Sequence, residues 1–147
     1  MINNYDAAHR LLNLLENAKK YPTFRSKIDL FFIDHEFVPL LVQESYLNTF
    51  GPRNDMQDIE KMAEASDLIS LGDQVNIKIR MDQNWSLLPN YAVLSSVGPC
   101  ILSSGSCSYP GFPQWLGKNS SARKSKRLIR ELKQKVSESL SANQYAI

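Results

Sequence analysis

The chain of 147 residues is poor in the residue types that most often carry enzyme chemistry. It has two cysteines, Cys100 and Cys107, and two histidines, His9 and His35. Two cysteines are too few for a disulfide scaffold, and neither residue type shows the paired spacing of a zinc site. The six glycines include no phosphate-binding loop that ends in Gly-Lys-Ser or Gly-Lys-Thr. We therefore expect no ATP hydrolysis, cofactor or metal in this chain.

Long apolar runs are also missing. No stretch of 18 or more apolar residues occurs, and residues 1–10 have neither a basic start nor an apolar segment typical of a signal peptide. We expect an intracellular protein with no membrane partner. The apolar content of 43% and the length predict one soluble domain, in which folding hides about 69% of the unfolded surface.

Two groups of residues could in principle form a catalytic or metal site. A Cys107 nucleophile with a histidine base is formally possible, but the surrounding Ser-rich loop resembles no nucleophile turn. Asp34 and Glu36 flank His35 and can be interpreted as a carboxylate pair or a metal site. We favour a helix-capping cluster, because Asp is a preferred N-cap and acids stabilise a first turn.

The charge is distributed unevenly along the chain. Residues 1–117 hold nine Lys or Arg against thirteen Asp or Glu, whereas residues 118–147 hold eight against two. Projected as a helix, the basic end is amphipathic. Its apolar side carries Leu128, Ile129, Leu132, Val136 and Leu140, and its basic side carries Arg123, Lys126, Arg127, Arg130 and Lys133. A basic face can bind phosphates, lie on an anionic membrane or only be solvated.

The remaining pattern is mostly helical, with a period of 3.6 residues. The apolar spacing predicts a first helix of about four turns with Asn4 as its N-cap, and another from Met56 to Leu71, capped by Asp55 and ended by Gly72. Further helices are expected in 36–49 and from Pro89 to Val97. We expect a loop over 98–113, a turn around 115–117, and a last helix capped by Asn119 and the following serines.

The segment from Val75 to Met81 is ambiguous. Apolar and polar residues alternate in it as in a half-buried strand, yet no second alternating run lies nearby to pair with it. An unpaired strand would leave backbone groups unsatisfied, so we favour a helix. Trp85 follows directly, between polar residues and Ser-Leu-Leu-Pro, as a ring for packing or for stacking.

Three strings, in this order, resemble one family: KIDLFFIDHEFVPLLVQESYL, AEASDLISLGDQVNIKIRMDQNWSLLPNYAVLSSVGP and FPQWLGKNSSARKSKRLIREL, at 27–47, 63–99 and 112–132. They are similar to the large subunit of replication factor C, the eukaryotic sliding-clamp loader. The resemblance implies an all-α fold of about six to seven helices, like the family's C-terminal collar domain. Residues 1–22 would correspond to the helix leaving the AAA+ module, and 23–147 to the collar. The AAA+ module, which handles ATP and Mg²⁺ in the family, has no counterpart in this sequence.

The resemblance also implies partners and sites. The collar of the family joins small subunits into a hetero-pentamer that loads the sliding clamp on primer-template DNA, so we expect a nuclear protein. The resemblance implies that aromatic residues of the large-subunit collar melt the primer end, a role that falls by motif position on Trp85 and then on Phe32. The alternative for both rings is packing in the core. With the basic helix, the expected DNA-binding residues are Trp85, Phe32, Arg123, Lys126, Arg127, Arg130 and Lys133. The alternative is a helical protein-interaction domain without a nucleic-acid role.

Overall fold

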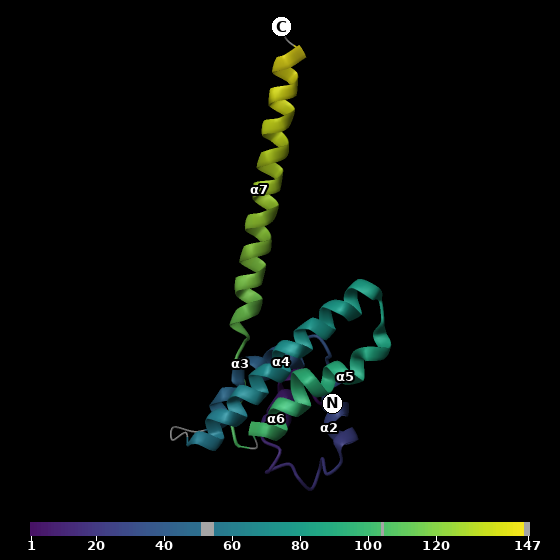
Figure 1. The fold of residues 1–147 in the computed structure, drawn as a ribbon, viewed down its shortest axis with the longest axis vertical. Coiled ribbons are helices and arrows are strands. Elements are labelled where there is room, and N and C mark those ends of the chain that lie inside the picture. The colour runs from purple at the N-terminus through teal and green to yellow at the C-terminus, as the bar shows by residue number, and fades with distance from the viewer. Residues whose placement is uncertain (51–54, 104, 146–147) are drawn as a thin grey trace. The chain divides into compact units, whose positions relative to one another are not determined.

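The computed structural model describes residues 1–50, 55–103 and 105–145 (Figure 1). Within these ranges all regular structure is helical and no strand occurs, which confirms the predicted all-α class. The chain forms two compact units, Met1–Phe112 and Pro113–Ile147. The expected boundary at residue 22 stays a prediction. None of the helices in the described ranges is long and apolar enough to cross a membrane.

Seven α-helices occur in the described residues, in agreement with the predicted six to seven. The first unit contains α1 (Asn4–Leu12), α2 (Phe24–Phe31), α3 (Val38–Ser45), α4 (Met56–Asp82), α5 (Leu88–Ala92) and α6 (Gly98–Ser103). Between them lie two short 3₁₀ segments, η1 (Tyr46–Phe50) and η2 (Trp85–Leu87), and a π-helical turn, η3 (Val93–Val97). The second unit is the single helix α7 (Gln114–Tyr145).

Local chemistry sets the helix starts. The carboxylate of Asp55 accepts a hydrogen bond from the backbone N–H of Asp58, so the predicted N-cap of α4 is confirmed. Thr23 caps α2 with a reciprocal capping box. Pro39 lies in the first turn of α3, where a backbone N–H has no partner within the helix, so its absence in proline costs no hydrogen bond. For α1 the predicted cap was wrong by one residue, because Asn3 accepts from the Asp6 N–H.

α4 is the longest element of the first unit, and it pairs with the segment that follows it. After α4 the chain reverses direction at η2, and α5, η3 and α6 return alongside α4 as a helical hairpin (Figure 1). Val75–Met81 lies inside α4, so the preference for helix is confirmed. The prediction that Gly72 ends this helix was wrong. A Cβ at Gly72 would lie 3.4 Å from Leu94 Cβ, so the glycine lets the two arms approach closely.

Two apolar clusters form the core of the first unit. The larger cluster joins α1 and α3 to α4 and α6, with Leu11, Leu41 and Val97 fully buried. The smaller cluster lies toward η2 and consists of Phe31, Ile79, Tyr91 and Ala92. This smaller cluster supports the end of the hairpin that carries Trp85.

Four further expectations were wrong. α1 ends at Leu12, after fewer turns than predicted, because the chain enters a series of turns at Asn13. Residues 98–103 form α6 rather than a loop. The last helix begins at Gln114, so it includes residues 115–117, which were expected to form a turn, and Asn119 lies inside it and does not cap it.

Candidate nucleic-acid interface

The reversal between the two arms of the hairpin holds Trp85. Gln83 ends α4 in the left-handed region, with φ of 54°. The backbone N–H groups of Gln83 and Asn84 both donate to the carbonyl of Ile79, the pattern of a Schellman-type helix end. The chain therefore turns sharply and presents residue 85 at the tip of the hairpin.

The Trp85 ring is held at a defined orientation and is 45% exposed. Its indole Nε1–H donates to Oε1 of Gln83 at 3.3 Å. The imidazole of His35 meets it in an edge arrangement, with 6.3 Å between ring centroids and 68° between planes. The ring thus contacts His35 and Gln83 while almost half of the residue stays exposed, which leaves indole surface available for stacking.

Phe32 is the C-cap of α2 and is 43% exposed. Its ring packs edge-on against Phe31, 5.1 Å away, and Phe31 in turn packs edge-on against Tyr91 at 5.7 Å. Phe31 is fully buried in the smaller core cluster. Phe32 thus lies over a rigid apolar base.

Two contacts join the segment that follows Phe32 to the end of the hairpin. His35 packs on Trp85, and the guanidinium of Arg80 lies 3.5 Å from the carboxylate of Glu36. Phe32 and Trp85 therefore belong to the same end of the first unit. The pattern of the sequence did not single out His35 as a neighbour of Trp85, because the contact joins residues 50 positions apart.

Tyr91 is the only titratable member of the smaller core cluster, and its hydroxyl is protonated at neutral pH. Burial raises the pKa of the Tyr91 hydroxyl, and the nearby Asp73 carboxylate raises it further. Burial also raises the pKa of Asp73 itself.

The cluster around His35 serves as a cap. Oδ1 of Asp34 accepts hydrogen bonds from the backbone N–H groups of Glu36, at 3.2 Å, and of Phe37, at 3.0 Å. The Asp34 carboxylate thus caps the turn at residues 35–37 that leads into α3. The N-cap of α3 itself is Phe37, which makes no side-chain cap hydrogen bond, so the predicted capping of a helix by this cluster was wrong. Among the described residues no group of three or more His, Cys, Asp or Glu is placed to hold a metal.

The remaining candidate, Cys107, is tied to α1. Its backbone N–H donates to Oδ1 of Asn13 at 2.8 Å, and its carbonyl accepts from Nδ2 of Asn13 at 3.1 Å. Burial raises the pKa of its thiol, which lowers the thiolate fraction at neutral pH. These contacts favour a structural role for Cys107.

The five basic candidates lie on α7, in the second unit. Every one of them is exposed: Arg123, Lys126, Arg127, Arg130 and Lys133. Arg127 Nε lies 3.7 Å from Glu131 Oε1, one turn along the helix, and both side chains are solvated. Such a pair is weak, so Arg127 remains available to an anion. The apolar side of the helix is also at least half exposed, from Leu128 to Leu140.

These features define an all-helical domain with two exposed aromatic rings on one end and a separate basic helix. Comparison with known proteins gives the family. A family model described as "Replication factor RFC1 C terminal domain" matches residues 69–147, more than half of the chain. The chain belongs to the family of C-terminal domains of the replication factor C large subunit.

Curated relatives agree with this assignment. "Replication factor C subunit 1" of Drosophila melanogaster is 43% identical over 117 residues, which cover 77% of this chain and 12% of that protein. The Saccharomyces cerevisiae protein of the same name is 41% identical over 135 residues, which cover 87% of this chain and 16% of that protein. The Homo sapiens protein is 43% identical over 110 residues, which cover 72% of this chain and 10% of that protein. The chain thus spans only a small fraction of the length of these relatives.

Proposed function

We propose that this chain is the collar part of a clamp-loader large subunit and acts on the primer end of DNA. It joins the small subunits of replication factor C in a nuclear hetero-pentamer that loads the sliding clamp on primer-template DNA. ATP and Mg²⁺ are handled by AAA+ modules of that assembly, and this chain contributes no catalytic residue. The family membership supports the assembly role, and the exposed, oriented ring of Trp85 carries the DNA role.

Trp85 is the group that meets the duplex end. Its free surface stacks on the last base pair of the primer, while His35 and Gln83 fix the ring so that little freedom is lost on binding. Stacking a base on an aromatic ring is worth about 1–3 kcal/mol, which is comparable to the energy of unstacking a base. The ring can therefore offset much of the energy needed to open a terminal pair.

Phe32 acts beside it. The ring is exposed to a similar degree and rests on Phe31, which cannot move without opening the smaller core cluster. A rigid second ring on the same end gives the separated strands two stacking surfaces instead of one. This placement supports a joint action of Trp85 and Phe32 in melting.

The basic side of α7 supplies phosphate contacts. An Arg or Lys that neutralises a phosphate releases a condensed counterion, so the affinity falls as the salt concentration rises. The five exposed cations of α7 fit this role because they share one side of the helix and four of them form no ion pair among the described residues.

The second candidate function is a helical protein-interaction domain without a nucleic-acid role. One observation favours it: the apolar side chains of α7 are at least half exposed along three turns, from Leu128 to Leu140. A face of this kind commonly packs on a partner helix. Under this alternative, the aromatic rings and the basic residues would contribute only to packing and solubility.

One experiment separates the two functions. The natural full-length protein carrying this chain is assembled with its small subunits, and primer-template binding is measured by anisotropy between 50 and 200 mM salt. Charge reversal at Arg127 and Arg130 should reduce the slope of log affinity against log salt by about 1 per lost phosphate contact. Charge reversal at Lys124 and Lys135, which project outside the basic side, is the matched control. An unchanged slope in the Arg127 and Arg130 variant, with assembly intact, would support the interaction domain instead.

A further inference from the structure

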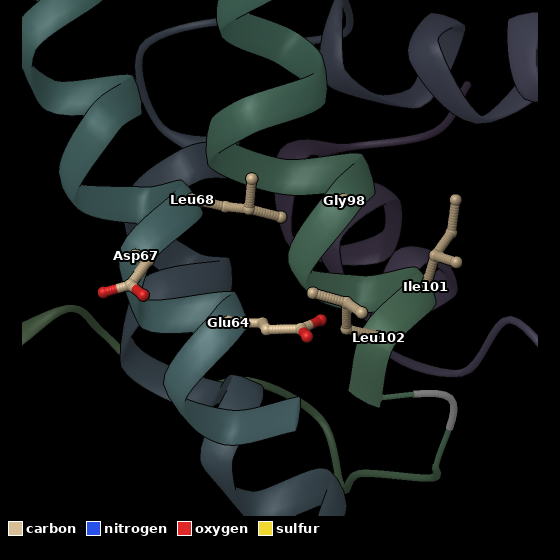
Figure 2. A pocket seen from close by; sticks show the side chains of 6 residues that line it. All are labelled: Glu64, Asp67, Leu68, Gly98, Ile101 and Leu102. Carbon is tan, nitrogen blue, oxygen red and sulfur yellow. The ribbon is translucent and has the colours of Figure 1, made fainter. Parts of the chain in front are cut away.

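An open pocket lies between the two arms of the hairpin, away from the exposed rings. It has a volume of about 460 Å³ and is lined by Glu64, Asp67, Leu68, Gly98, Ile101 and Leu102 (Figure 2). The first three belong to α4 and the last three to α6. We name it the α4–α6 pocket.

The floor of the pocket is apolar because of Gly98. A Cβ at this position would lie 3.0 Å from Cδ1 of Leu68, so the missing side chain leaves Leu68 room against α6. Ile101 lies one turn further along α6 and is 42% exposed. When a partner covers an aliphatic side chain that otherwise stays in water at the edge of a cavity, the burial of its apolar surface stabilises the complex.

One carboxylate is directed at the opening of the pocket. Figure 2 shows Glu64 extending from α4 toward Leu102, whereas the carboxylate of Asp67 points away from α6, on the outer flank of α4. Neither carboxylate forms an ion pair within the part of the chain that the structure describes. A ligand with positive charge next to an apolar group would satisfy both the floor and the Glu64 carboxylate.

From this complementarity we infer that the α4–α6 pocket binds a helix of a neighbouring subunit, which inserts one large apolar side chain and places a Lys or Arg one turn away, opposite Glu64. Apolar insertion between two helices is the common way in which a helix docks in a groove. A small molecule is disfavoured because Ile101, Glu64 and Asp67 all remain accessible, whereas small-ligand sites bury most of the ligand. The inference rests on the proposed function, since it assigns a surface and a partner chemistry to the assembly.

The test uses the natural full-length protein carrying this chain, co-expressed with the small subunits of replication factor C from the same organism. Charge reversal of Glu64 and Asp67 to Lys should weaken assembly about tenfold, and reversal of Glu44 and Glu60, which are exposed and do not line the pocket, should leave it within about twofold. Ile101→Asp should weaken assembly by a similar factor. Thermal melting of each variant shows that the fold is retained.

A photo-crosslinking residue at position 101 then identifies the occupant. We expect crosslinks to an apolar residue of a small subunit that has Lys or Arg within four positions, and none from the same residue placed at Ile77, which is exposed on α4 outside the pocket. Crosslinks to DNA or to a second copy of this chain would overturn the inference, as would normal assembly of the Glu64 and Asp67 variant. In each of these outcomes the proposed function stands, whereas failure of the unmodified protein to assemble would overturn both.

Discussion

Replacing Trp85 by Ala should impair melting of the primer end more than it impairs assembly. A tryptophan side chain has about 250 Å² of surface, and 45% of it is exposed here. About 110 Å² is therefore free to be covered, which corresponds to about 2.8 kcal/mol as an upper limit. A base covers one face, so about half of this area, or 1.4 kcal/mol, is a lower estimate. Opening of the terminal pair should then fall by about tenfold to 100-fold.

The assay places a fluorescent base analogue, 2-aminopurine, at the 3′ end of the primer and follows its unstacking on binding of the assembled complex. Clamp loading is measured separately. The substitution also removes the packed part of the ring, so the free energy of unfolding is expected to fall by up to about 3 kcal/mol. Melting must therefore be compared at a temperature where both proteins are fully folded.

Trp115 provides the matched control. It is the other tryptophan of the chain and is 50% exposed, but it lies on α7. Trp115→Ala removes a similar exposed area and should leave melting within about twofold. An unchanged signal for Trp85→Ala in a folded, assembled complex would refute the reasoning, and so would an equal loss in both variants.

Three further predictions concern the fold. Asn13→Ala should lower the free energy of unfolding by about 1–3 kcal/mol in a denaturant titration, because it leaves backbone groups of Cys107 without partners, and a normal transition would contradict this. Gly98→Ala should destabilise the chain by about 1–3 kcal/mol, since its Cβ would lie 2.7 Å from a backbone carbonyl, whereas Gly117→Ala, with open space around it, should stabilise α7 slightly. Iodoacetamide should modify Cys107 in the native protein, and the rate should rise with pH because the thiolate is the reactive form and burial raises the pKa of this thiol. The buried Cys100 should react only after unfolding. Equal modification rates for Cys100 and Cys107 in the native protein would refute the burial of Cys100.

Helix type and several boundaries could be predicted because the chemistry that sets them is local. Asp55 caps α4 with its own side chain, and Pro39 lies in the first turn of α3, where no N–H is needed. The bounds of this second helix were less exact, because α3 covers Val38–Ser45 instead of the expected 36–49, and 46–50 is 3₁₀. The alternation of apolar and polar residues in Val75–Met81 predicts the burial of its apolar residues only in part. Val75 and Ile79 face the smaller core cluster, but Ile77 and Met81 are exposed, so half of the apolar pattern reflects no burial within this unit.

The errors arise where distant residues decide the local structure. α1 stops at Leu12 because the side chain of Asn13 bonds both the carbonyl of His9 and the backbone of Cys107, 94 positions away. Gly72 continues a helix because Leu94 packs against it from the other arm. In both cases the residue type allowed a helix end, and a tertiary contact determined whether the end formed.

Packing and stacking, posed as alternatives for Trp85, are compatible in the structure. The edge contact with His35 and the hydrogen bond to Gln83 use part of the ring, and 45% of its surface stays free. A ring that was wholly exposed would lose rotational freedom on stacking, and one that was wholly buried would have no surface for a base. Partial burial against two fixed neighbours avoids both limits, because the ring is already ordered when the ligand arrives. One of the two contacts that orient Trp85 therefore comes from His35, a residue outside its own segment of the sequence.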